Sequence, residues 1–204
     1  MADKAYMDGR KKYSRPQAVL FSESPGILSS GVYVPDGYEA GNLDNSNKDF
    51  IILSDHNRSS LDIGLQRIEN RQRMVNGRMR SYWIADKRSL SISWEMLPSR
   101  SFSKDPNFDT STGLPTGIGT QYTIDGGAGG AELLDWYDNH YGTFYVFLSY
   151  DKFTEFGRDD AAYGHLGEYQ EVLEMYIADF SYSVEKRGGT NFDMWNCSIS
   201  LEEA

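Results

Sequence analysis

The residues of this sequence that could perform chemistry are few and widely spaced. The three histidines are His56, His140 and His165. None of them belongs to an HExxH motif or stands at a zinc-ligand spacing from the single cysteine. That cysteine, Cys197, alternates with Trp195 and Ile199, a pattern that predicts a buried apolar side chain rather than a nucleophile. We therefore expect no catalytic residue, no metal and no cofactor.

Two other groups of residues have the composition of a chemical site. The run 126–130 is glycine-rich and precedes an expected helix, as a phosphate loop would. No Gly-Lys-Ser/Thr follows it, and Glu132 stands where a Rossmann loop needs its third glycine, so we interpret the run as a flexible hinge. The carboxylates of residues 159–174 could serve acid–base catalysis or bind Ca²⁺, but their spacing fits no EF-hand or glycosidase rule: Asp159, Asp160, Glu168, Glu171 and Glu174. A cytoplasmic hydrolase or glycan-binding β-sandwich that uses them is the alternative from a different functional class.

A basic segment over residues 67–100 raises the question of nucleic-acid binding. Four of its arginines straddle a predicted hairpin beside Tyr82 and Trp83, and a β-ribbon could present them to phosphates: Arg71, Arg73, Arg78 and Arg80. The rest of the chain is strongly acidic, however, which argues against specific binding of nucleic acid.

Charge is distributed unevenly along the 204 residues. The net charge of −10 divides into +3 over residues 1–16, −5 over 17–66, +5 over 67–100 and −13 over 101–204. Clustered signs occur on ordinary solvated surfaces. They also suit a subunit whose basic face meets the acidic face of the next copy, which favours ring or head-to-tail assembly. The candidate interface residues on this interpretation are Arg71, Arg73, Arg78, Arg80, Arg100, Asp159 and Asp160.

The elements that would position these residues are mostly strands. Asn76-Gly77 predicts a hairpin turn between strands over roughly 69–75 and 78–85, because both positions tolerate a positive φ. Residues 89–96 alternate apolar and polar side chains, as a half-buried antiparallel strand does, until Pro98 ends it. Further strands are expected near 31–34 and over 50–55, 58–68, 143–150, 169–185 and 192–201. Residues 101–130 are expected to be a long loop.

One helix is expected over residues 131–141, with an apolar stripe formed by Leu133, Leu134, Tyr137 and Tyr141 and with Gly142 after it. Strands without βαβ alternation predict a mainly-β protein, an antiparallel β-sandwich or barrel with one packed helix, extended loops and an N-terminal arm. We expect two parts: residues 1–49 as a loop-rich arm and 50–204 as the β-domain. The candidate core consists of Leu90, Ile92, Trp94, Leu133, Tyr137, Phe144, Val146, Trp195 and Ile199.

The composition of the chain indicates both that it folds and in which cellular compartment it is made. At 39% hydrophobic and 14% aromatic residues the chain can bury a core, so wholesale disorder is excluded. We expect no signal peptide, no membrane span and no membrane partner. One cysteine excludes an internal disulfide and favours a reducing site of synthesis.

The sequence resembles structural proteins of tailed-bacteriophage tails, namely tail-tube subunits and the related distal-tail and baseplate ring proteins. The stretches that carry the resemblance are residues 71–82 leading to 93–100, the expected helix at 132–137 with the strand at 142–146, and the terminal strand 193–203 ending in Leu-Glu-Glu. Together they span roughly residues 50–204, and residues 1–49 have no counterpart.

The resemblance implies a non-enzymatic virion protein made in the cytoplasm of a host bacterium. Proteins of this kind are β-sandwiches with a flanking helix; six copies form a ring whose inner strands join into a barrel, and rings stack into a hollow tube. The implied partners are further copies, other tail proteins, and DNA that passes an acidic lumen without specific binding. A distal-tail, baseplate-ring or tail-terminator protein is the alternative within the same class.

Overall fold

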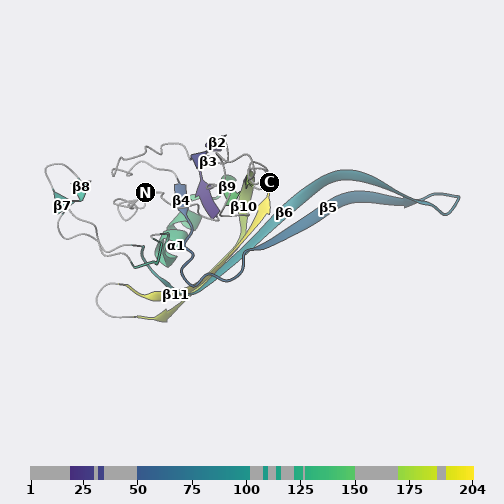
Figure 1. Cartoon of the computed structure of the whole chain (residues 1–204). Coiled ribbons are helices and arrows are strands. Elements are labelled where there is room, and N and C mark those ends of the chain that lie inside the picture. Colours follow the sequence, from purple (N-terminus) through teal and green to yellow (C-terminus); the bar gives the residue numbers. More distant parts are fainter. Residues whose placement is uncertain are drawn as a thin grey trace, which may run out of the picture.

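Seven antiparallel strands form one large sheet in the order β4-β1-β9-β10-β11-β6-β5 (Figure 1). The computed structural model describes residues 19–29, 32–34, 50–101, 108–109, 114–115, 122–125, 127–149, 170–187 and 192–204. The strands of the sheet are β1 (Val19–Ser22), β4 (Phe50–Ile52), β5 (Asp62–Arg73), β6 (Met79–Pro98), β9 (Phe144–Ser149), β10 (Gln170–Lys186) and β11 (Met194–Glu203). Two small ribbons pair β2 (Ile27–Ser29) with β3 (Val32–Val34) and β7 (Phe108–Asp109) with β8 (Leu114–Pro115).

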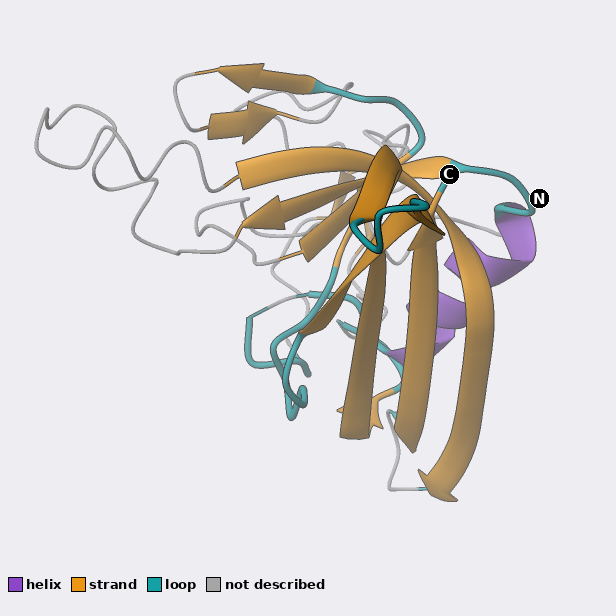
Figure 2. Cartoon of the chain, turned by 90° about the vertical axis from the view of Figure 1, so that its right-hand side faces the viewer, coloured by secondary structure: helices purple, strands orange, loops and turns teal. Residues whose placement is uncertain are grey.

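Within the described residues there is one helix, α1 (Gly130–Asn139), and Figure 2 shows it against one face of the long strands. The prediction of a mainly-β protein with one packed helix is confirmed. No helix of the described residues is long and apolar enough to cross a membrane. Val19–Ser22, from the segment expected to be an arm, lies inside the sheet between β4 and β9.

The β5–β6 hairpin pairs a strand of 12 residues with one of 20, and its turn is where the sequence predicts it. Gly77 adopts a φ of +78°, and the Asn76 side chain accepts a hydrogen bond of 3.1 Å from the Arg78 backbone amide. A positive φ is accessible to glycine without steric cost, so the Asn-Gly pair fixes the turn and the register of the two strands.

Alternation along the paired strands builds the core on the helix side of the sheet. Leu90, Ile92 and Trp94 of β6 pair with Leu201, Ile199 and Cys197 of β11, and all six side chains are buried. Trp94 also donates a hydrogen bond of 2.7 Å from Nε1 to the Ser54 carbonyl. Seven of the nine expected core residues are buried: Leu90, Ile92, Trp94, Leu133, Phe144, Val146 and Ile199. A smaller cluster on the other face consists of Leu20, Phe50, Ile52 and Phe147.

The remaining two expected core residues lie nearer the surface. Trp195 is partly buried and stacks on Tyr182 at a ring-centroid distance of 5.0 Å. Tyr137 is 40% exposed and covers Phe180 with one ring face, so it is not a core residue. The helix packs through Leu133 of the expected stripe and through Trp136, which fills the space beside Phe21 and Phe144, whereas Tyr137 and Tyr141 of that stripe are exposed.

The alternation of residues 169–185 predicts that one face of β10 is formed by Val172, Tyr176, Ala178, Phe180, Tyr182 and Val184, and the structure divides this set between two faces. A register shift falls between Ile177 and Asp179, where Ala178 is the extra residue. An extra residue exchanges the two faces of a strand beyond it. Leu173, Met175 and Ile177 therefore face the core before the bulge, and Phe180 faces it afterwards.

The glycine run before α1 is not a flexible hinge where the structure describes it. A Cβ on Gly127 would lie 2.5 Å from Cα of Ser54, and one on Gly129 would lie 2.5 Å from the carbonyl oxygen of Pro98. A Cβ on Gly130 would meet the Trp195 ring at 2.9 Å. These glycines let two backbone segments and a tryptophan approach closely, so their role is in packing.

Glu132 fixes the start of the helix from a buried position, and its loss is expected to be costly. Its Oε2 accepts a hydrogen bond of 2.6 Å from the backbone amide of Gly129, and its Oε1 accepts bonds from the amide and the hydroxyl of Ser101. Glu132→Ala would leave these buried donors unpaired, so we expect the free energy of unfolding to fall by about 2–4 kcal/mol in chemical denaturation. Glu132→Gln, which keeps one acceptor oxygen, should lose less. An alanine variant as stable as the parent would contradict this role.

Candidate subunit interface

The distal part of the β5–β6 hairpin projects from the body as a two-stranded arm (Figure 1). The β6 residue at which pairing with β11 ends is Ser89, opposite Glu202, so among the described residues, residues 65–88 have only each other as strand partners. We call this segment the hairpin arm. Ten strand residues at about 3.3 Å each give it a length of about 33 Å.

The hairpin arm exposes large apolar side chains. Leu65 is 75% exposed, Trp83 64% and Ile84 62%, and Val75 at the turn is fully exposed. Ile84 has no strand partner, since Ala85 pairs with Ile68 and Trp83 pairs with Glu69. An isolated two-stranded hairpin is at best marginally stable in water, and an apolar surface of this kind is typical of a protein interface. The sequence signal was the apolar run Tyr82-Trp83-Ile84, of which only Tyr82 and Trp83 were considered, as neighbours of the arginines in a nucleic-acid ribbon.

Ion pairs brace the proximal half of the hairpin arm. Arg67 donates from Nε to Asp86 at 2.9 Å, and Arg71 pairs with Glu69. Hydrogen bonds from Arg67 and then Trp83 lower the pKa of Asp86, and hydrogen bonds from Ser81 and then Arg71 lower the pKa of Glu69. Both carboxylates therefore stay charged to lower pH than usual and hold this half of the hairpin in place.

The distal half carries unpaired positive charge. The structure gives Arg73, Arg78 and Arg80 no carboxylate partner among the described residues. The whole hairpin arm holds seven basic and two acidic side chains, a net charge of +5, whereas the chain carries −10. The remainder of the protein therefore carries −15, and the hairpin arm is a basic element on an acidic body.

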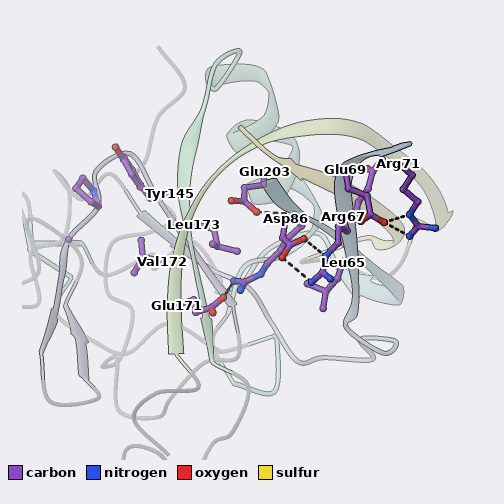
Figure 3. Close-up of a pocket in the computed structure, with 14 residues that line it drawn as sticks. Leu65, Arg67, Glu69, Arg71, Asp86, Tyr145, Glu171, Val172, Leu173 and Glu203 are labelled. Atoms are coloured by element: carbon purple, nitrogen blue, oxygen red, sulfur yellow. Dashed lines mark hydrogen bonds and ion pairs between the residues drawn. The ribbon is translucent and has the colours of Figure 1, made fainter. Parts of the chain in front are cut away.

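A groove of about 1200 Å³ lies where the hairpin arm leaves the body (Figure 3). Arg67, Arg71 and Arg88 line it together with Glu69, Asp86, Glu171 and Glu203, next to Leu65, Leu173 and Tyr145. Arg88 pairs with Glu171 of β10, and its backbone amide donates a hydrogen bond of 2.9 Å to Glu203 of β11. We call this hollow the base groove; its bonds tie the root of the hairpin arm to the body.

Two long strand edges have no neighbour among the described residues. One is the outer edge of β5, the last strand of the sheet. The other is residues 176–186 of β10, because β9 pairs only with Gln170–Met175. Open edges of this length expose unpaired backbone groups that readily pair with another chain.

The sheet face turned away from α1 is polar over these long strands. Most of its side chains are serines, carboxylates and a few neutral residues: Asp62, Gly64, Ser89, Ser91, Ser93, Glu95, Asn196, Ser198, Ser200, Glu202, Tyr176, Asp179, Ser181, Ser183 and Glu185. We call this surface the polar face. These residues include five carboxylates, and Lys87, the next β6 residue on the same face, lies at the edge of the surface and donates a hydrogen bond to the Ala204 carbonyl oxygen.

The structure brings together part of the expected interface. Arg71, Arg73, Arg78 and Arg80 all belong to the hairpin arm, as the hairpin prediction implied. Arg100 is exposed on the body near the start of α1, so it does not join them. Asp159 and Asp160 lie outside the described residues.

The carboxylates and other groups considered for chemistry are placed as follows. Glu171 pairs with Arg88, and Glu174 accepts a hydrogen bond of 2.6 Å from Thr143, while Glu168 and His165 lie outside the described residues. Burial raises the pKa of Cys197 to about 12, so its thiol is unreactive at neutral pH. No cluster of metal-ligating side chains occurs within the part of the chain that the structure describes.

Comparison with known proteins adds little to this geometry. No family model and no curated sequence matches the chain. Among solved structures, a chain in the tail of an empty GTA particle, refined with C6 symmetry, shares 8% identity and a TM-score of 0.40. The match covers 78% of this chain and 84% of that one. This degree of similarity establishes neither a shared family nor a shared function.

Proposed function

We propose that this protein is a non-enzymatic structural subunit of a bacteriophage-type tail, a tail-tube protein that forms stacked hexameric rings around a DNA conduit. The observation that carries the proposal is the hairpin arm, which exposes Leu65, Trp83 and Ile84 and bears +5 on a body of −15. The tip arginines of this arm have no carboxylate partner among the described residues. Docking on another copy explains the arm, because it buries the apolar side chains and neutralises the arginines.

The two open edges support a head-to-tail ring rather than a two-fold dimer. The strands β10, β11, β6 and β5 alternate in direction, so β5 of one copy can pair antiparallel with β10 of a copy related by simple rotation. Pairing β5 with another β5 would bring together two strands that each carry Arg67, Arg71 and Arg73. The free half of β10 carries Asp179 and Glu185, so its pairing with β5 is electrostatically more favourable.

The offset between the two edge strands also suits closure of the sheet into a barrel. The four strands β10, β11, β6 and β5 overlap only in part: β5 extends beyond one end of the overlap, and the free half of β10 extends beyond the other end. Such a stagger is required when a sheet closes into a barrel of tilted strands. With α1 outside, the polar face would line the channel, and its carboxylates would repel the phosphate backbone so that DNA slides without being held.

In this role the protein would reside in the virion tail after synthesis in the host cytoplasm, with its own copies and other tail proteins as partners. Negative-stain microscopy of the purified chain tests the proposal. Open-ended tubes are the expected result. Single or double rings that stop growing would indicate the distal-tail, baseplate or terminator position, and a persistent monomer that cleaves or binds glycans would overturn the tail assignment.

Reversing two charges of the hairpin arm should disrupt assembly more than folding. We expect Arg78→Glu combined with Arg80→Glu to abolish tubes at protein concentrations where the parent forms them, because like charges then meet at the interface. The melting temperature of the unassembled chain should change by no more than a few degrees, since neither side chain has a described partner. The control is Arg78→Lys with Arg80→Lys, which keeps the charge. Equal losses of stability and assembly would count against the electrostatic role.

A further inference from the structure

A second hollow lies at the carboxyl end of α1. It has a volume of about 380 Å³ and is lined by Tyr137, His140, Tyr141, Gly142, Thr143, Tyr176 and Ile177. Tyr141 is 93% exposed, and Tyr137 and Tyr176 are about two-fifths exposed. We call it the α1 hollow. Its aromatic walls are uncovered among the described residues, which is typical of a surface that binds a partner.

The surroundings of the α1 hollow are negative. The last turn of α1 contains no basic residue, although the helix dipole favours cations there, and it contains Asp138. Three lining residues are held by carboxylates: His140 contacts Glu23 at 3.0 Å, Thr143 donates to Glu174, and the Tyr176 hydroxyl donates to Glu202 at 2.7 Å. No lysine or arginine lines the hollow.

The tip of the hairpin arm has the complementary chemistry. Residues 73–80 place the exposed apolar side chains of Met74, Val75 and Met79 between Arg73, Arg78 and Arg80. The tip is held by hydrogen bonds of 2.8 Å from the amides of Gly77 and Met74, so it is a formed turn before any partner binds. An apolar residue flanked by arginines fits an aromatic hollow with carboxylates, through apolar burial and cation–π contacts.

The base groove is a poorer receptor for the same tip. Three arginines already line it, whereas the α1 hollow has none. The hairpin arm also points away from the α1 of its own chain (Figure 1), so the tip cannot reach its own hollow. The occupant must come from a second copy.

We propose that the tip of the hairpin arm of one copy, residues 73–80, docks in the α1 hollow of another copy. The contact joins two different surfaces, so it is heterologous and propagates from copy to copy. This inference rests on the proposed function, since it names the contact through which the arms would link subunits.

Engineered cysteines test the contact directly. The native Cys197 is buried and its thiol has a raised pKa, so it should not compete. The full chain carrying both Val75→Cys and Tyr141→Cys should form a disulfide-linked ladder under mild oxidation, because a disulfide requires Cβ atoms within about 4 Å. A mixture of the two single variants should give dimers only, and neither single variant alone should cross-link. Val75→Cys paired with Ser91→Cys, on the polar face, is the matched negative control.

A charge exchange gives a second measurement. Arg78→Asp and Asp138→Arg should each lower the yield of cross-linked dimer roughly tenfold, and the two together should restore it. Tubes in the microscope without a 75–141 ladder would overturn this docking and leave the proposed function standing. Dimers of Val75→Cys alone would show tip-to-tip contact and also overturn it. A chain that stays monomeric would overturn both.

Discussion

A chain whose hairpin arm is replaced by a short turn is expected to fold and to lose assembly altogether. Gln66 and Lys87 are directly opposite partners, so residues 67–86 can be replaced by Asn-Gly, which closes two-residue hairpins. The deletion removes Trp83, Ile84 and the tip arginines but none of the buried core. We therefore expect monomers in sedimentation and microscopy, with a melting transition as cooperative as that of the parent.

A point variant separates the length of the hairpin arm from its chemistry. Trp83→Ser with Ile84→Ser keeps the arm but removes two exposed apolar side chains, and it should weaken assembly at least tenfold because buried aromatic anchors dominate interfaces. Glu95→Ser, an exposed position of the polar face outside the hairpin arm, serves as the control. An armless chain that still builds tubes would refute the role assigned to the hairpin arm.

The substitution expected to damage the fold most is Gly129→Ala. Its new Cβ would lie 2.5 Å from the carbonyl oxygen of Pro98 and 2.6 Å from the amide of Arg100. Both are backbone atoms of the segment between the end of β6 and Ser101. Because Ser101 is hydrogen-bonded to Glu132 at the start of α1, neither this segment nor the helix can shift without breaking hydrogen bonds. We expect a loss of about 3 kcal/mol in the free energy of unfolding, measured by denaturant titration.

Gly142→Ala is the matched control for this substitution. A Cβ at Gly142 meets no atom within 4 Å, although the glycine flanks the same helix. It should change stability by no more than about 0.5 kcal/mol. Similar losses in the two variants would show that glycine at position 129 matters for chain flexibility and not for close packing.

Local sequence patterns predicted the strands well where the alternation of apolar and polar side chains is not interrupted by a bulge. The alternation of residues 89–94 and the hairpin turn at Asn76-Gly77 are present as expected, because side-chain period and turn geometry are encoded within a few residues. The alternation expected to continue to Met96 ends at Trp94, since Met96 has a φ of +53° at a register shift and Leu97 is buried instead. The predicted face of β10 was wrong before Ala178, where Leu173, Met175 and Ile177 face the core, since a bulge depends on how β11 pairs across the sheet. The position of Val19–Ser22 between β4 and β9 could not be predicted either, because a segment of four residues does not indicate which strands it pairs with.

The candidate interface was predicted in composition but not in shape. The arginines of residues 71–80 indicated a basic hairpin. A hairpin with alternating side chains, however, has the same sequence pattern whether it lies inside a sheet or projects from it. What separates the two is the point at which β11 stops pairing, at Ser89 and Glu202, a distance of more than one hundred residues along the chain. Sequence periodicity carries no information on such long-range pairing.

The polar face has a consequence for small ions as well as for DNA. Its five carboxylates outnumber the single lysine at its edge, Lys87, so the surface attracts counterions from the surrounding solution. Repeated around a ring with this face inward, the carboxylates would form bands of fixed negative charge, the arrangement that makes a pore cation-selective. Such a channel would stay filled with mobile cations and admit few anions. A polyanion passing through it would be separated from the wall by a layer of these cations.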